Sequence, residues 1–215
     1  MDTNVSDVYN QWSNTYDEIE NKTRDLDRVA TQTVLEKIIG FSTLVLELGC
    51  GTGKNTAWLV NKAQHVTAVD FSEHMLNKAR EKFSTTNLMF LQADITQPWK
   101  FESDSFNVVT CNLILEHIKN IDFVFSEAAR VLKKDSGYFF VSELHPAKQY
   151  LGSKARFEKD DELVSPDCFT HHTSEYFSSA INNGFNCIEL MEWFDDNNPK
   201  LMPRLISFLF KKITQ

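Results

Sequence analysis

Three glycines at alternate positions and one later aspartate are the residues of this chain best suited to binding a ligand. Gly49, Gly51 and Gly53 directly follow the largely apolar run 45–48. Glycine adopts positive φ at little steric cost and lets a ligand approach the bare main chain. Asp70 follows about twenty residues later, the spacing at which a carboxylate meets a ribose diol. The pattern therefore predicts a nucleoside-binding site between a strand and a helix.

Three classes of ligand compete for such a turn. The phosphate loop of an NTPase requires G-x-x-x-x-G-K-[ST], and here Leu48 and Asn55 stand where the first glycine and the hydroxyl belong. The dinucleotide turn requires G-x-G-x-x-G, and Lys54 replaces its third glycine. The third class is S-adenosylmethionine, a nucleoside that has an amino-acid tail and no phosphate.

The stretch from Glu47 to Gly53 resembles the first motif of class I S-adenosylmethionine-dependent methyltransferases, E-x-G-x-G-x-G, at every fixed position. The resemblance implies that Asp70 binds the ribose and that Asp94 bonds the adenine amine. Glu47 either orients the turn or contacts the ammonium group of the cofactor. Tyr16, within a Tyr-Asp pair, is implied to cover the cofactor.

The cofactor-binding residues that we expect come from several separate segments of the chain. They are Tyr16, Glu47, Gly49, Cys50, Gly51, Asp70, Phe71, Met75, Ala93, Asp94, Ile95, Asn112, Leu113 and His117. Phe71 and Met75 would lie against the adenine, and Asn112, Leu113 and Glu116-His117 would line the methionine end. The product left in this site would be S-adenosylhomocysteine.

Methyl transfer needs little from the protein beyond alignment, but an amine or hydroxyl acceptor must also lose a proton. Histidine titrates in the useful range for a general base. His145 and His117, both just beyond strand ends, are the candidate catalytic residues, and His171 and His172 could overhang the same opening. A structural role is the alternative for each of these histidines.

The elements that position these residues follow from apolar periodicity and turn signals. We expect helices near 26–39, 54–63, 72–83, 121–134 and 173–183, and strands near 45–48, 66–70, 88–92, 106–112, 138–144, 185–194 and 205–213. Alternating strands and helices predict an α/β, doubly wound, Rossmann-like, mostly parallel sheet with helices on both faces. The resemblance implies seven strands, the last one antiparallel and inserted between the fifth and sixth.

Residues 1–40 are expected to form an N-terminal helical cap, with an aromatic face running from Val5 to Ile19. Residues 41–215 would form one S-adenosylmethionine-binding domain, in which 147–172 is a lid on the acceptor side. Gly40 is expected to cap the C-terminal end of the helix at 26–39.

The composition and net charge argue against several classes of protein. The chain has 215 residues, 42% of them hydrophobic, and a net charge of −8. No basic cluster stands out, which argues against a nucleic-acid substrate. Four widely separated cysteines form no paired ligand motif, so we expect no metal site and a reducing, cytoplasmic setting. No apolar run approaches the length of a membrane span.

The sequence thus favours a methyltransferase that acts on a small-molecule acceptor. A catalytically inactive, cofactor-binding partner subunit is the alternative, and an NAD-dependent oxidoreductase is a weaker one. The residues determine neither the acceptor atom nor the oligomeric state.

Overall fold

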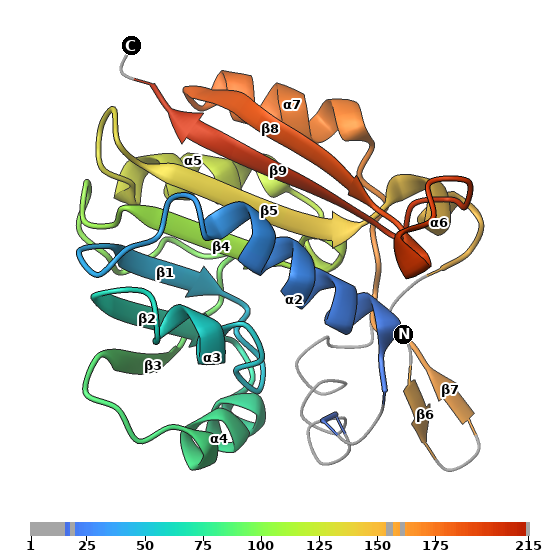
Figure 1. The fold of residues 1–215 in the computed structure, drawn as a ribbon, viewed down its shortest axis with the longest axis horizontal. Helices are drawn as coiled ribbons and strands as arrows, with labels where there is room; N and C mark the ends of the chain where they lie inside the picture. Colours follow the sequence, from blue (N-terminus) through green and yellow to red (C-terminus); the bar gives the residue numbers. More distant parts are fainter. Residues whose placement is uncertain (1–15, 18–19, 154–156, 160–161, 214–215) are drawn as a thin grey trace.

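A single seven-stranded sheet organises the chain (Figure 1). The structure is a computed structural model that describes residues 16–17, 20–153, 157–159 and 162–213. The sheet order is β3-β2-β1-β4-β5-β9-β8. Its strands are β1 (Leu44–Leu48), β2 (His65–Asp70), β3 (Leu88–Gln92), β4 (Val108–Asn112), β5 (Tyr138–Leu144), β8 (Phe185–Trp193) and β9 (Leu205–Lys212).

The direction of β9 confirms the fold that the sequence predicts. β1, β2, β3, β4 and β5 pair in parallel, whereas β9 pairs antiparallel with both β5 and β8. Strand order reverses between β1 and β4, the first strands of the two halves of the sheet. Open sheets of this kind bind ligands in the crevice beyond the carboxyl ends of the strands at that reversal.

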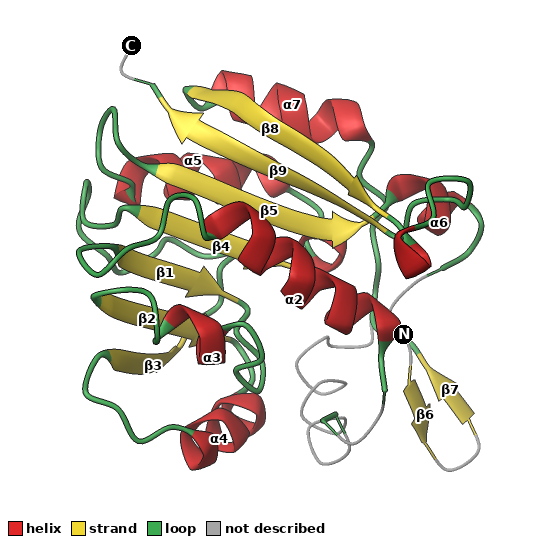
Figure 2. Cartoon of the chain, in the orientation of Figure 1, coloured by secondary structure: helices red, strands yellow, loops and turns green. Residues whose placement is uncertain are grey.

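Helices cover both faces of the sheet, as Figure 2 shows. The helices are α2 (Lys22–Leu35), α3 (Thr56–Leu59), α4 (Glu73–Lys82), α5 (Ile121–Val131), α6 (Pro146–Tyr150) and α7 (Thr173–Asn182), with short 3-10 turns η1 (Leu115–His117) and η2 (Asp195–Asn197). α2 lies across one face, and α5 and α7 lie on the other (Figure 1).

Each face has its own apolar core. On the α5 and α7 side, Phe125, Phe139 and Phe210 are fully buried and pack with ring centroids 5.1 to 6.4 Å apart. On the opposite face, Leu35 of α2 and Leu76 of α4 are fully buried in a second cluster. The strands between the two edges of the sheet are therefore buried on both sides, as their nearly continuous apolar residues predict.

Several predicted helix limits are wrong. α2 begins at Lys22 because the Asn21 side chain accepts a hydrogen bond from the amide of Arg24. It ends at Leu35, so Gly40 is not its cap; the Gly40 amide donates instead to Thr43 Oγ1. The helix expected at 54–63 is reduced to α3, with turns on either side of it.

The predicted lid at 147–172 contains more regular structure than its sequence indicates. It holds most of α6 and a two-stranded antiparallel hairpin, β6 (Phe157–Lys159) and β7 (Glu162–Val164). The aromatic face expected from Val5 to Ile19 falls largely outside the described residues, of which it includes Tyr16. None of the helices in the described ranges has both the length and the apolar character of a membrane span.

Candidate S-adenosylmethionine site

The three motif glycines all adopt the left-handed backbone that their spacing predicts. Their φ angles are +65° at Gly49, +54° at Gly51 and +89° at Gly53. A Cβ atom on Gly51 would meet nothing within 4 Å, whereas one on Gly49 would lie 2.4 Å from Cγ2 of Ile114. Gly51 thus opens the main chain toward a ligand, and Gly49 allows close packing against the segment after β4.

A cavity of about 480 Å³ lies over this turn. That volume is typical of a small-molecule site. All the cofactor-binding residues named from the sequence line it, namely Tyr16, Glu47, Gly49, Cys50, Gly51, Asp70, Phe71, Met75, Ala93, Asp94, Ile95, Asn112, Leu113 and His117. The fold therefore brings together segments that are about one hundred residues apart. The lining also includes Arg24, Asp27, Thr52, Lys54, Asn55, Thr96, Ile114 and Ile118, which the sequence did not single out.

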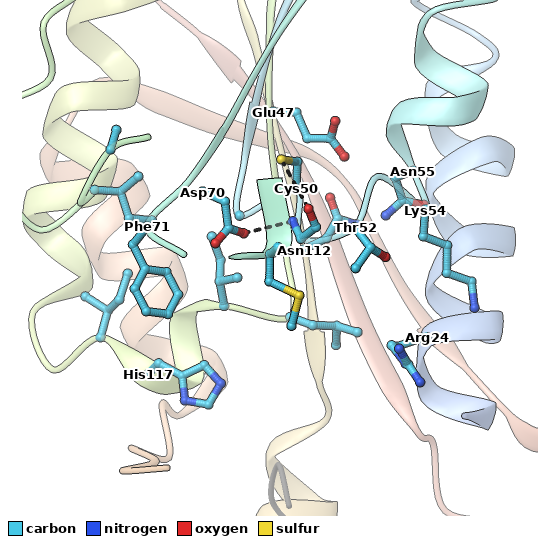
Figure 3. Close-up of a pocket in the computed structure, with 18 of the residues that line it drawn as sticks. Arg24, Glu47, Cys50, Thr52, Lys54, Asn55, Asp70, Phe71, Asn112 and His117 are labelled. Atoms are coloured by element: carbon cyan, nitrogen blue, oxygen red, sulfur yellow. Dashed lines mark hydrogen bonds between the residues drawn. The ribbon is translucent and has the colours of Figure 1, made fainter. Parts of the chain in front are cut away.

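Asp70 joins the end of β2 to the glycine turn (Figure 3). Its Oδ2 accepts a hydrogen bond from the Gly51 amide at 2.8 Å, and its Oδ1 accepts one from the Ser72 amide at 2.9 Å. Burial raises the pKa of this carboxyl to about 6, although the backbone donors oppose that rise. An ionised carboxylate has about four acceptor positions, so these backbone donors leave room for a ligand hydroxyl.

Glu47 lies at the base of the cavity, 3% exposed. Its Oε2 accepts a hydrogen bond from Thr56 Oγ1 at 2.6 Å, which ties β1 to the start of α3. Burial raises the pKa of Glu47 to about 8, and the negative charges of Asp27 and Asp70 add to that rise. Both functions expected for Glu47 fit this place, since it orients the turn and also faces the cavity.

Phe71 and Asp94 line the cavity beyond the ends of β2 and β3. One oxygen of Asp94, Oδ1, accepts from both the amide and the hydroxyl of Thr96, at 2.9 and 2.6 Å. This local turn holds the carboxylate at the mouth of the cavity. Met75, 1% exposed, lies on α4 beneath the same region. A flat, largely apolar base with one exocyclic amine matches these surroundings.

The segment before α2 is attached to the glycine turn. Thr52 Oγ1 donates to Asp17 at 2.7 Å, and Lys82 of α4 donates to the other oxygen of Asp17. The neighbouring ring of Tyr16 lines the cavity, with the Arg24 guanidinium carbon 4.0 Å from its centroid. The Tyr-Asp pair thus lies over the turn, as the sequence resemblance predicts.

Asn112 and Asp27 form a polar contact that the sequence did not predict. The Asn112 amide nitrogen donates to Oδ1 of Asp27 and to the Thr31 hydroxyl, each at 2.8 Å. Asp27 is 4% exposed although it lies in the middle of α2. The sequence did contain a sign that Asp27 is buried, because Asp27 lies on the same face of the helix as Ala30, Thr31 and Val34.

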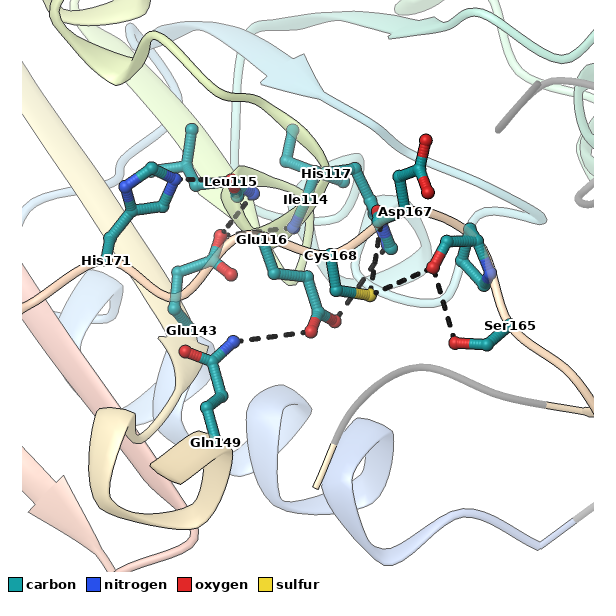
Figure 4. A network of polar contacts seen from close by, with 11 residues as sticks. Ile114, Leu115, Glu116, His117, Glu143, Gln149, Ser165, Asp167, Cys168 and His171 are labelled. Carbon is teal, nitrogen blue, oxygen red and sulfur yellow. Dashed lines mark hydrogen bonds and ion pairs between the residues drawn. The ribbon is translucent and has the colours of Figure 1, made fainter. Parts of the chain in front are cut away.

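His117 is the candidate base that the fold places in the cavity. Its Nδ1 lies 3.0 Å from the Asp167 carbonyl oxygen, and its Nε2 lies 3.9 Å from Oε1 of Glu116 (Figure 4). A carbonyl oxygen only accepts, so Nδ1 carries the proton and Nε2 of the neutral ring is an acceptor. Cys168 Sγ, 3.9 Å from Nδ1, lies beside the same ring.

The other histidines near strand ends have structural contacts. His145 is not among the residues that line the cavity; its Nδ1 accepts from the Ala147 amide at the start of α6, and its Nε2 lies 3.1 Å from Glu192. His171 is buried, with Nε2 2.8 Å from the Ile118 carbonyl oxygen. His172 is the N-cap residue of α7.

Three buried carboxyls, Asp27, Glu47 and Asp70, face one cavity. Among the described residues, none of the three forms an ion pair within 4 Å. An ionised carboxylate that is buried without an opposite charge is unfavourable, so a cationic ligand would favour the ionised form of these acceptors. In the same ranges, no three His, Cys, Asp or Glu side chains are arranged so that they could hold a metal ion together.

The inserted antiparallel strand, the glycine turn and the carboxylate at the end of β2 together form the arrangement that the resemblance to class I S-adenosylmethionine-dependent methyltransferases implies. Residues 46–141 match the family model described as the methyltransferase domain. This match favours S-adenosylmethionine among the three ligand classes that compete for the turn.

Comparisons with individual proteins agree with this assignment. The chain is 34% identical over 152 residues to demethylmenaquinone methyltransferase of Lactococcus lactis, covering 66% of the chain and 59% of that protein. It is 33% identical over 117 residues to malonyl-[acyl-carrier protein] O-methyltransferase of a Paenibacillus strain, covering 48% of the chain and 42% of that protein. The chain thus spans about half the length of the curated relatives it matches.

The crystal structure of a protein described as a putative S-adenosylmethionine-dependent methyltransferase from Listeria monocytogenes has the same fold. Its TM-score to this chain is 0.71 at 22% identity, over 86% of this chain and 99% of that one.

Proposed function

We propose that the protein transfers a methyl group from S-adenosylmethionine to a small-molecule acceptor. The observation that carries the proposal is the convergence of the bare Gly51 backbone, the Asp70 carboxylate and the Asp94 carboxylate on one cavity. Asp70 would hold the ribose hydroxyls, Asp94 the adenine amine, and Phe71 with Met75 the base. S-adenosylmethionine supplies an electrophilic methyl group whose transfer requires no protonation of the leaving group.

His117 is the residue that we propose as general base for an acceptor with an O–H or N–H group. Its Nδ1 lies 3.0 Å from the Asp167 carbonyl oxygen, to which it donates, and Nε2 is the atom that we assign to take the proton of the acceptor. Glu116, 3.9 Å from Nε2, would stabilise the imidazolium that results. A positioned base of this kind typically accelerates a reaction about 10²- to 10⁴-fold.

The apolar lining favours an acceptor with an apolar body. Leu113, Ile114 and Ile118 line the cavity on the His117 side and would exclude water from the acceptor. Relatives are named for methyl transfer to demethylmenaquinone and to a malonyl group on an acyl carrier, which supports a metabolite as the acceptor. The net charge of −8 supports neither a nucleic-acid substrate nor an anionic partner, and four free cysteines support a reducing, cytoplasmic setting.

Calorimetric titration followed by a transfer assay tests the proposal. The purified chain is titrated with S-adenosylmethionine, with S-adenosylhomocysteine and with NADH, and is then incubated with methyl-labelled cofactor and pooled metabolites. We expect both S-adenosyl compounds to bind, NADH not to bind, and label to appear in a small product. The Gly51→Val variant is the control that should bind neither nucleoside.

Each negative outcome has a distinct meaning in this experiment. Failure of the wild type to bind S-adenosylmethionine would contradict the site itself. Tight binding with no labelled product from any acceptor pool would favour the inactive, cofactor-binding subunit instead.

A further inference from the structure

Asp27 is a buried carboxylate on the cavity wall that neither the motif nor the proposed chemistry uses. It lies on α2, 4% exposed, and lines the cavity. Its Oδ1 accepts from Asn112 Nδ2 at 2.8 Å and its Oδ2 accepts from Asn55 Nδ2 at 2.9 Å. Two neutral amides orient this carboxylate, but they supply no positive charge.

The position of Asp27 is opposite the adenosine end of the cavity. Asp94 follows β3 and Asp70 ends β2, whereas Asn112, the partner of Asp27, ends β4. In the order β3-β2-β1-β4, three strand spacings separate the two ends, roughly 14 Å. Figure 3 shows Asp70 and Phe71 on one side of the cavity and Asn55, Lys54 and Arg24 on the other. An amino-acid tail that extends from the ribose would therefore reach the Asp27 side.

A second acceptor at this end of the cavity belongs to Asn55. Oδ1 of Asn55 is buried and, among the described residues, has no hydrogen-bond partner. The same Asn55 side chain donates to Asp27 through its nitrogen. A buried acceptor without a donor costs roughly 1–3 kcal/mol. An ammonium group has three N–H donors, so it could satisfy both this oxygen and the carboxylate of Asp27.

The positive charge of Arg24, close to Asp27 on the same helix, matches the carboxylate of an amino-acid group. Arg24 precedes Asp27 by three residues on α2 and also lines the cavity. Residues three apart lie on the same face of a helix. One helical face thus presents a positive and a negative side chain to the cavity, which is the charge pattern that a zwitterion requires.

We infer that Asp27 binds the α-ammonium group of the methionine tail of the cofactor, with Asn55 as a second acceptor. The inference rests on the proposed function and goes beyond the motif, because it assigns cofactor recognition to the helix before the first strand. Asp27 would be a binding residue, since it contacts the tail and not the methyl group. A purely structural role, in which Asp27 only holds Asn55 and Asn112 together, is the competing explanation.

A pair of ligands that differ only in the ammonium group separates these explanations. Calorimetry compares S-adenosylhomocysteine with its deamino analogue, which retains the thioether, carboxylate and adenosine. We expect the wild type to prefer S-adenosylhomocysteine by at least tenfold. Asp27→Asn keeps the shape of the side chain and should reduce that preference to threefold or less, while affinity for the analogue changes less than threefold.

The control variant is Glu36→Gln, an exposed carboxylate next to the end of α2 that pairs with Lys62. It should keep the wild-type preference. If Asp27→Asn weakens both ligands equally, or leaves the preference unchanged, the ammonium assignment is wrong. If Asp27→Asn does not fold, Asp27→Ser is measured in its place. A wild type that does not prefer S-adenosylhomocysteine over the deamino analogue overturns the assignment without any variant.

These outcomes are distinct from a failure of the proposed function. Binding of either nucleoside by the wild type supports the site whatever Asp27 does. A wild type that binds neither of them overturns both proposals together.

Discussion

The Asp70 carboxylate accepts a hydrogen bond from the Gly51 amide at 2.8 Å. This contact joins the two most informative parts of the sequence, the glycine turn and the acid that ends the second strand. A single side chain thus holds the turn in its left-handed conformation and, through its remaining acceptor positions, is available to ribose hydroxyls. The shape of the turn and the recognition of the ligand are therefore coupled.

Replacement of Asp70 by alanine should weaken cofactor binding by at least tenfold, or about 1.4 kcal/mol, because charge-assisted hydrogen bonds to the ribose are lost. Isothermal titration with S-adenosylhomocysteine measures the change. Glu73→Gln, an exposed substitution on the adjacent helix, serves as the control. An unchanged affinity in Asp70→Ala would remove this carboxylate from the site.

Substitutions at two glycines of the same turn should have different consequences, one for ligand binding and the other for stability. Gly51→Val should abolish binding and leave the protein folded, because the new side chain meets open space where the ligand would lie, at a backbone cost of roughly 1–2 kcal/mol. Gly49→Ala should lower the free energy of unfolding more, since its Cβ would overlap the Ile114 side chain. Thermal unfolding and ligand titration of both variants test this contrast. Normal binding by Gly51→Val would exclude a close approach of the ligand to that backbone.

Glu47 should make the protein less stable as the pH rises from about 5 to 7. Its pKa is raised from 4.5 to about 8 by burial, so in this range the folded state holds a proton that the unfolded state has released. Stability then falls with pH by roughly 1.4 kcal/mol per unit from this group. Glu47→Gln removes the titration, and its free energy of unfolding should depend on pH less steeply by that amount. Parallel wild-type and variant curves in urea would show that Glu47 is ionised in the fold.

Alanine substitutions at His117 and His145 should have different effects, the first on turnover and the second on stability. His117→Ala should lower turnover by about 10²-fold or more, a much larger factor than any loss of affinity for S-adenosylhomocysteine, because a base acts chiefly on the acceptor. His145→Ala should mainly lower stability, by about 1 kcal/mol, because His145 caps α6. Steady-state turnover and thermal unfolding of both variants provide the measurements. Full activity in His117→Ala would return that residue to a structural role.

Much of the site could be predicted because its determinants are local in sequence. The Glu47–Gly53 motif and Asp70 belong to one strand-turn-helix-strand unit, and their spacing alone places the carboxylate beside the turn. The strand ends at Gln92 and Asn112 were also readable from apolar runs. Because parallel strands share one carboxyl edge, all the residues expected there line one cavity.

The helix limits and the choice among histidines could not be predicted in this way. The limits of α2 depend on which side chain forms a hydrogen bond with which amide. The cap at Asn21 was overlooked, and the prediction that Gly40 caps the helix was wrong. His145 and His117 follow strand ends equally well, yet only the second lines the cavity. No periodicity distinguishes them, because the difference arises from contacts with Ala147 and Asp167.

The sequence by itself predicted the α/β class of the fold, the succession of strands and helices along the chain and the ligand chemistry of the turn, because backbone conformation and side-chain spacing are short-range properties. Only the tertiary structure decided that Asp27 enters the cavity and that His145 remains outside it. Both residues are placed by packing between elements far apart in the chain. A helix that precedes the sheet supplies a buried charge, and nothing in its local sequence specifies what that charge will face.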